Sequence, residues 1–124
     1  MAKTIMVVDD SATMRLSLKS ALELNGFKVQ CAGDGLQALT LLTVGSKPDL
    51  IITDINMPNM GGIEFIKNLR GLAGFRFIPV LALTTESKQE KRDEAKKYGA
   101  TGWLVKPVAG PDLVKVIKQV LPGA

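Results

Sequence analysis

The stretch that decides the fold runs Leu50-Ile51-Ile52-Thr53-Asp54-Ile55-Asn56-Met57-Pro58-Asn59-Met60-Gly61-Gly62. Its first four residues form an apolar, β-branched run that is too short for a buried helix. We therefore predict a strand buried on both faces, as in a parallel sheet. The proline and the glycine pair predict a sharp turn after it, which leaves Asp54 at the carboxyl end of the strand, where open α/β sheets bind ligands. The alternative is that Asp54 only caps a turn.

Length and composition limit the classes of protein to consider. The chain has 124 residues, so we expect one domain over residues 1–124 with a sizeable core. No apolar run approaches the ~20 residues of a membrane span, and the start lacks a secretory signal, so we expect a cytoplasmic protein without membrane insertion. Cys31 is the single cysteine and histidine is absent, which excludes an intrachain disulfide, a Cys/His zinc site and a Ser-His triad. The net charge of +4 is modest, and the lysines are interleaved with acidic residues, so we expect no nucleic-acid partner.

The rest of the chain alternates between short apolar runs and amphipathic patterns. The expected strands are Thr4 to Val8, Phe27 to Cys31, Leu50 to Thr53, Val80 to Thr84 and Trp103 to Val105. Helices are expected from Ser11 to Asn25-Gly26, around Ala38 to Leu42, over Ile63, Ile66 and Leu69, from Ser87 to Tyr98, and from Pro111 onward. Residues 71–77 are expected to form a loop.

Five strands alternating with five helices predict an α/β fold, with a doubly wound parallel sheet and helices on both faces. The strands then point the same way, and polar residues that follow four of them meet at one edge. These residues are Asp9 and Asp10, Asp54, Thr84 and Lys106. The second strand ends in Ala32 and Gly33 and offers nothing comparable. Three neighbouring carboxylates repel one another unless a cation lies among them.

Carboxylate oxygens without histidine or thiol are the ligands that suit Mg²⁺, which leaves room for a phosphoryl oxygen. Phosphoryl transfer needs a metal, a fixed cation and hydrogen-bond donors around an in-line nucleophile. Asp9 and Asp10 suit the metal, Lys106 is the cation and Thr84 is the hydroxyl donor. Asp54 is left as the nucleophile, because a carboxylate can attack phosphorus to give an acyl phosphate.

The chain resembles the receiver domains of response regulators, and most of all the single-domain chemotaxis regulators of the CheY type. The resemblance covers the whole chain. Four motifs carry it, namely Asp9-Asp10-Ser11 with Met14-Arg15, Asp54-Ile55-Asn56-Met57-Pro58 with Met60 and Gly62, Thr84-Thr85-Glu86, and Lys106-Pro107. It implies a flavodoxin-like strand order of 2-1-3-4-5. It also implies direct Mg²⁺ ligation by Asp10, Asp54 and the carbonyl of Asn56, ligation by Asp9 through water, and a cis Lys106-Pro107 peptide.

The resemblance also implies a function. Asp54 receives a phosphoryl group from the phosphohistidine of a sensor histidine kinase of the CheA type. Thr84 and the aromatic position occupied by Trp103, usually tyrosine or phenylalanine, then form a switch. The fourth helix, fifth strand and fifth helix present the result to a partner such as a flagellar motor switch protein. A phosphatase is a further possible partner. We expect a monomer that catalyses only its own phosphotransfer and autodephosphorylation.

The sequence also allows three other interpretations. The same site suits a phosphorelay shuttle that passes the phosphoryl group to a phosphotransfer protein. A haloacid dehalogenase-type phosphatase also uses an aspartate nucleophile, but it needs an acid two residues later, where this chain has Asn56. Gly33-Asp34-Gly35-Leu36-Gln37-Ala38 matches a dinucleotide fingerprint, yet Asp34 would repel a pyrophosphate and a turn entering a helix explains the glycines.

Overall fold

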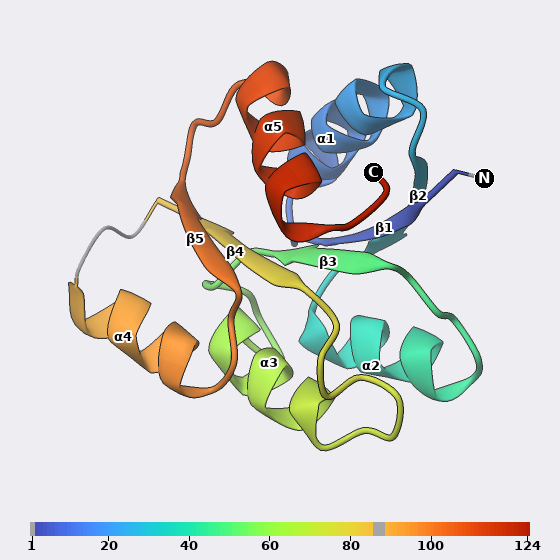
Figure 1. Ribbon diagram of the computed structural model, residues 1–124. Coiled ribbons are helices and arrows are strands. Elements are labelled where there is room, and N and C mark those ends of the chain that lie inside the picture. The colour runs from blue at the N-terminus through green and yellow to red at the C-terminus, as the bar shows by residue number, and fades with distance from the viewer. Residues whose placement is uncertain (1, 86–88) are drawn as a thin grey trace.

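The computed structural model describes residues 2–85 and 89–124, and its centre is a five-stranded parallel sheet (Figure 1). The strand order is β2-β1-β3-β4-β5, so the expected fold and order are confirmed. The strands are β1 (Thr4–Val8), β2 (Lys28–Ala32), β3 (Leu50–Thr53), β4 (Val80–Thr84) and β5 (Gly102–Val105). The helices are α1 (Ala12–Leu24), α2 (Gly35–Thr43), α3 (Gly62–Arg70), α4 (Gln89–Lys97) and α5 (Gly110–Val120).

The helices form two layers on the sheet. Helices α1 and α5 cover one face, and α2, α3 and α4 cover the other (Figure 1). β3 is the central strand, because it pairs with β1 on one side and with β4 on the other. Since all the pairings are parallel, the carboxyl ends of the strands share one edge and their amino ends share the opposite edge.

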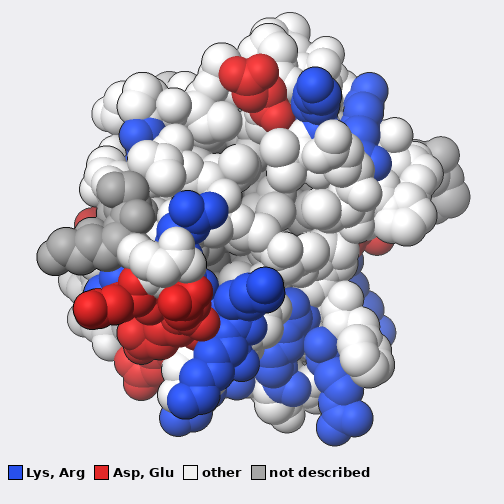
Figure 2. Space-filling model, turned by 60° about the vertical axis from the view of Figure 1, so that its left-hand side comes forward, with Lys and Arg blue, Asp and Glu red and all other residues white. Residues whose placement is uncertain are grey.

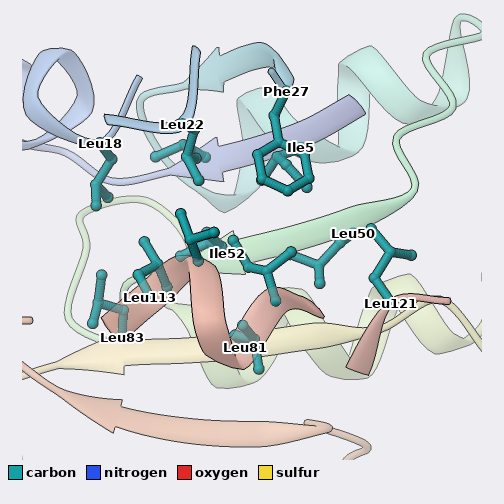
Figure 3. Packing of buried hydrophobic residues seen from close by; sticks show 13 residues of the cluster. Ile5, Leu18, Leu22, Phe27, Leu50, Ile52, Leu81, Leu83, Leu113 and Leu121 are labelled. Atoms are coloured by element: carbon teal, nitrogen blue, oxygen red, sulfur yellow. The ribbon is translucent and has the colours of Figure 1, made fainter. Parts of the chain in front are cut away.

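The two layers bury two hydrophobic clusters, one on each face of the sheet. Leu50 and Ile52 of β3 belong to the cluster under α1 and α5, whereas Ile51 belongs to the cluster under α2 and α3. Figure 3 shows the first cluster, with leucines and isoleucines of the sheet packed against side chains of α1 and α5. The prediction that β3 is buried on both faces is confirmed. Each such side chain contributes about 1.5–3 kcal/mol to folding.

Helix α1 has the ends that its sequence predicts. The Ser11 hydroxyl accepts a hydrogen bond from the N–H of Met14 at 3.2 Å and so caps the first turn. Asn25 is the C-cap, and Gly26 follows with a φ of 87°, in the left-handed region that glycine adopts without strain. These caps fix where α1 ends and where the chain turns back toward β2.

Two strands differ from the sequence prediction by one residue, β2 at both ends and β5 at its start. β2 begins at Lys28, because the Phe27 N–H donates to the Leu22 carbonyl and so closes the turn after α1. The strand then continues to Ala32, which pairs with Val8 of β1. β5 begins at Gly102, which pairs with Leu81. Hydrogen bonds to residues outside the strand, which the local sequence does not show, set these boundaries.

Three helices also differ in detail from the prediction. In α3 the buried face includes Phe65, which the prediction omitted, whereas Ile63 is only half-buried. α5 begins at Gly110, so Pro111 is its second residue. α4 is described from Gln89 onward, and residues 86–88, which include the expected start of this helix and Glu86, lie outside the described residues. The described part of α4 is mostly exposed to solvent, and Ala95 is its buried residue.

Gly62 is the residue that lets α3 begin directly beneath the end of β3. Its N–H donates to the Ile55 carbonyl at 2.9 Å. A Cβ atom placed on Gly62 would collide with the carbonyl oxygen of Asp54, which is backbone and cannot move aside cheaply. The start of the helix and the position of Asp54 therefore depend on the missing side chain.

We expect Gly62→Ala to lower the free energy of unfolding by about 2 kcal/mol or more, because the added methyl group must displace the Asp54 backbone. Urea unfolding followed by circular dichroism measures this change. The matched control is Gly71→Ala, where the added Cβ would meet the Asn68 carbonyl at 3.5 Å, an ordinary contact. Equal stability of the two variants would contradict the proposed backbone collision.

Candidate functional site

The strand order brings Asp9 and Asp54 together at the carboxyl edge of the sheet. Asp9 directly follows β1 and Asp54 directly follows β3, and these strands are neighbours whose last residues, Val8 and Thr53, are paired. The Asp54 N–H extends this ladder by donating to the Val8 carbonyl at 2.8 Å. Backbone pairing therefore holds the two aspartates side by side before any side chain interacts.

Lys106 joins the two carboxylates. Its Nζ lies 3.0 Å from Oδ2 of Asp9 and 3.2 Å from Oδ2 of Asp54, and hydrogen bonds accompany both ion pairs. Lys106 directly follows β5, and its peptide bond to Pro107 is cis, as the resemblance implies. One ammonium thus lies between two buried aspartates that follow β1 and β3.

Backbone N–H groups hold the other oxygens of these carboxylates. The N–H of Ser11 donates to Oδ1 of Asp9 at 2.9 Å, and the N–H of Ile55 donates to Oδ1 of Asp54 at 2.7 Å. The Arg15 guanidinium also donates to the main-chain carbonyl of Asp9 at 2.6 Å. Both carboxylates are therefore fixed in orientation by the chain segments that immediately follow them.

The electrostatics of Asp54 and Lys106 differ. Burial raises the pKa of Asp54 above its usual range, and the charge of Lys106 and the Ile55 N–H oppose this shift without reversing it. Burial lowers the pKa of Lys106, but its interactions with Asp9 and Asp54 outweigh burial, and the net shift is upward. The two shifts differ because the ammonium of Lys106 is stabilised by two carboxylates, whereas the carboxylate of Asp54 shares one ammonium with Asp9. A second cation near Asp54 would therefore be favourable.

Asp10 completes an acidic cluster that could hold such a cation. One carboxylate oxygen from each of Asp9, Asp10 and Asp54 lies within 4.8 Å of the others. Asp10 is exposed, so its carboxylate faces solvent while the other two are buried. Oxygen donors open to water on one side are the type of ligand set that Mg²⁺ binds. The donor chemistry of this cluster therefore fits Mg²⁺.

The remaining residues expected at the site lie around this cluster. Thr84 is buried at the end of β4, and its carbonyl accepts a hydrogen bond from the Lys106 N–H at 2.7 Å. Asn56 is exposed in the loop after Asp54 and lines a groove between α3 and α4. Trp103 lies in β5, paired with Ala82, and its side chain is half-buried. The structure thus brings Asp9, Asp10, Asp54 and Lys106 into one cluster, with Thr84 joined to it through the backbone.

Asp34 is a residue near the site whose part in the fold the sequence analysis did not recognise. Its carboxylate accepts a hydrogen bond from the Gln37 N–H at 2.9 Å and caps α2, and it also accepts one from the Asn59 side chain at 2.8 Å. Asn59 has a φ of 65°, a left-handed conformation within the loop that follows Asp54. Asp34 therefore ties that loop to α2. The glycine-flanked aspartate before a helix was a visible capping signal, but its partner was not visible in the sequence.

We expect Asp34 to contribute stability that depends on pH. Hydrogen bonds from the Gln37 N–H and the Asn59 amide lower the pKa of Asp34 below its usual value, so its contribution is present above the unfolded-state pKa of 3.8 and is lost as pH falls through the lower, folded-state pKa. Asp34→Ala should lower the free energy of unfolding at about pH 7 by roughly 1–2 kcal/mol. Urea unfolding at a series of pH values measures this difference.

The matched control for Asp34→Ala is Ser11→Ala, which removes the cap of α1 but no carboxylate. We expect the difference between wild type and Asp34→Ala to shrink as the solution is acidified, and the Ser11→Ala difference to stay constant. A constant difference for Asp34→Ala would show that the ionised carboxylate contributes nothing beyond hydrogen-bond acceptance.

Charged side chains also gather on the surface beside the site. Figure 2 shows lysine and arginine side chains over the lower part of the molecule, where Figure 1 places α3 and α4, with acidic side chains next to them. The ring of Tyr98 lies 5.5 Å from Nζ of Lys67 and 5.6 Å from Nζ of Lys97.

None of the described helices is long and apolar enough to cross a bilayer.

Comparison with known proteins agrees with this geometry. Residues 5–118 match the response regulator receiver domain family. The chain is 40% identical to chemotaxis protein CheY-3 of Vibrio cholerae over 94% of its own length and 89% of that protein. It is 34% identical to response regulator MprA of Mycobacterium tuberculosis over 98% of its own length, which is 51% of that protein.

Solved structures give the same result. The chain superposes on Vibrio cholerae CheY4 with a TM-score of 0.93 and 41% identity, covering 98% of this chain and all of that one. The signal receiver domain of a histidine kinase from Syntrophus aciditrophicus gives a TM-score of 0.90 and 33% identity, covering 99% and 92%. The protein belongs to the receiver domain family of response regulators and is of the CheY type.

Proposed function

We propose that the protein is a cytoplasmic, phosphorylation-activated switch of a two-component system, with Asp54 as the phosphoryl acceptor. The observation that carries this proposal is the Lys106 ammonium between Asp9 and Asp54, beside the exposed carboxylate of Asp10. Asp9, Asp10, Asp54 and the Asn56 carbonyl would hold Mg²⁺. When bound, Mg²⁺ supplies positive charge for the phosphoryl oxygens. The identity of the family supports each of these assignments.

The chain's own groups account for the transfer step. One Asp54 oxygen attacks the phosphorus of a phosphohistidine, a new O–P bond forms and the N–P bond to the imidazole breaks. The Ile55 N–H holds the Asp54 carboxylate in place during attack. The Lys106 ammonium, which pairs with the Asp54 carboxylate before transfer, would pair with the phosphoryl group after transfer. The Thr84 hydroxyl would donate a hydrogen bond to a phosphoryl oxygen.

The partners follow from the class of protein. The donor would be a sensor histidine kinase of the CheA type, and the target would be a protein that reads the surface of α4, β5 and α5, for example a flagellar motor switch protein. The chain is 40% identical to a chemotaxis protein and covers 89% of its length, which supports chemotaxis or motility as the setting. A phosphatase would shorten the signal, and the switch would act as a monomer.

A phosphorelay shuttle is the second candidate. It uses the same acceptor chemistry but passes the phosphoryl group on to another histidine. The similarity to a receiver domain of a histidine kinase supports this candidate, because it shows that the same fold at 33% identity also occurs as part of a kinase. Transfer from phosphorylated Asp54 to a phosphotransfer protein, faster than its loss to water, would favour the shuttle.

A turnover enzyme is a weaker interpretation of the same site. A haloacid dehalogenase-type phosphatase needs a proton donor two residues after its nucleophile, and Asn56 is a carboxamide that cannot donate and regain a proton. We therefore propose that the protein catalyses only its own phosphotransfer and dephosphorylation. Release of phosphate from small esters in excess of the amount of protein would contradict this proposal.

We expect a small phosphodonor such as acetyl phosphate to add one phosphoryl group to the protein in the presence of Mg²⁺. Intact-mass spectrometry measures the addition. Asp54→Asn should abolish it because the nucleophile is lost, and excess chelator should reduce it by about tenfold or more because the acidic cluster then lacks its cation. The matched control is Asp49→Asn, which alters a carboxylate at the opposite edge of the sheet that accepts from the Thr4 N–H. Unchanged labelling of Asp54→Asn would refute the assignment.

We infer that Trp103 reports the switch. Its indole Nε1 is buried and makes no hydrogen bond within the described part of the chain, which is costly for an N–H group. The side chain lines a hollow of about 270 Å³ between α4 and β5. The Lys106 N–H donates to the Thr84 carbonyl, and Trp103 lies in β5, the strand that pairs with β4 and leads into Lys106. We propose that recruitment of Thr84 by the phosphoryl group changes the position of Trp103.

We expect beryllofluoride with Mg²⁺ to change the emission of Trp103, the single tryptophan, or its quenching by acrylamide. The two states of such a switch differ by a few kcal/mol, so a bound mimic can change their populations severalfold. Thr84→Ala should weaken the response while Asp54 can still be phosphorylated. The Thr85→Ala variant is the control. Identical emission and quenching with and without the mimic would show that the indole does not move.

A further inference from the structure

The edge of the sheet opposite Asp54 carries a hollow of about 590 Å³. Its walls are the loop before β3, residues 47–49, and the loop between α3 and β4, residues 73–79. Both loops lead into the amino ends of neighbouring strands, on the far edge from the acidic cluster (Figure 1). We call this hollow the Phe77 groove. It has no part in the phosphoryl chemistry.

The Phe77 groove combines exposed apolar surface with positive charge. Phe77 is 88% exposed, the largest exposure among the large apolar side chains of the described residues. Exposed Lys47 and Arg76 lie in the same walls. The one acid there is Asp49, whose carboxylate already accepts a hydrogen bond from the Thr4 N–H at 2.7 Å. Lys47 and Arg76 have no ion-pair partner among residues 2–85 and 89–124, so the groove offers two cations beside an uncovered aromatic ring.

Arg70 holds one wall of the groove in place from inside the molecule. Its guanidinium donates to the carbonyls of Phe75 at 2.9 Å and Ile78 at 2.7 Å. The same group donates to the Gly99 carbonyl, in the turn between α4 and β5. Burial lowers the pKa of Arg70, yet the group keeps four hydrogen bonds. The backbone on both sides of Phe77 is thus fixed, so the groove exists before any ligand arrives.

We propose that the Phe77 groove binds an extended segment of a partner protein in which an acidic residue lies beside an apolar one. The acidic side chain pairs with Arg76 and Lys47, and the apolar side chain enters the hollow and covers Phe77. A concave site favours a segment with protruding side chains over a flat bilayer. Because the groove is at the edge opposite Asp54, such a partner binds the phosphorylated and the unphosphorylated protein alike.

The test uses the full, ¹⁵N-labelled chain and acetylated, amidated octapeptides that place aspartate next to phenylalanine or separated from it by a residue, for example GSDFSLSG and GSDSFLSG. We expect amide shifts in Lys47, Asp49 and residues 73–78 during titration. A matching peptide with lysine in place of aspartate should bind about tenfold more weakly, because it meets like charge. Absence of shifts in these residues at millimolar concentrations of every acidic peptide would overturn the proposal.

Two variants and a control locate the interaction. Phe77→Ser and Arg76→Glu should each weaken binding of the acidic peptide about fivefold or more, and both change exposed side chains. Leu24→Ser, which removes an apolar side chain that is 87% exposed at the end of α1, should leave binding unchanged. Phosphorylation of Asp54 should be normal in all three variants, so loss of peptide binding and loss of the proposed switch are separate results. Peptide affinity unchanged by Phe77→Ser would overturn the proposal.

Two further measurements exclude other occupants. If the wild-type protein sediments with anionic phosphatidylglycerol vesicles and Phe77→Ser abolishes this binding, the groove binds a membrane surface instead. A concentration-dependent dimer that Phe77→Ser abolishes would assign it to a second copy of this chain. Either result would overturn the proposal, whereas wild-type protein that is monomeric and does not bind the vesicles agrees with it.

Discussion

The shared ion pair of Lys106 with Asp9 and Asp54 is the interaction on which the site depends. Two buried carboxylates at the ends of adjacent strands repel each other, and one ammonium at 3.0 and 3.2 Å offsets this repulsion. Neighbouring strands lie roughly 5 Å apart, so a residue after β5 must reach across β4 to meet Asp54. The long stem of the lysine side chain makes this reach possible.

The stability of the site comes from elsewhere in the molecule. Burial raises the pKa of Asp54, which means that its ionised form is disfavoured at this position. The two hydrophobic clusters, one on each face of the sheet, offset the free-energy cost of burying this carboxylate. β3 alone buries three aliphatic side chains completely or almost completely. A carboxylate whose ionised form is disfavoured by burial gains from a nearby positive charge, which Lys106 supplies here. The core therefore stabilises a fold that keeps this carboxylate buried.

Polar anchors outside the site hold the loops around it. Asp34 ties the loop after Asp54 to α2 through Asn59, and Gly62 lets α3 start against the Asp54 carbonyl. At the opposite edge, Arg70 joins the loop before β4 to the turn before β5. The Asp34–Asn59 hydrogen bond joins residues 25 apart in the chain, and the Arg70–Gly99 hydrogen bonds join residues 29 apart. They hold loops at both edges of the sheet, which differ in charge and in chemistry.

The sequence by itself determined the order of the elements, the parallel sheet and the set of residues at its carboxyl edge. It could do so because alternating buried strands and amphipathic helices leave one topology class, and in that class the strand ends meet. It did not determine that Lys106 pairs with both Asp9 and Asp54, that Asp34 reaches Asn59, or that β2 starts one residue late. Those features depend on distances between segments far apart in the chain, and only the packed tertiary structure sets such distances.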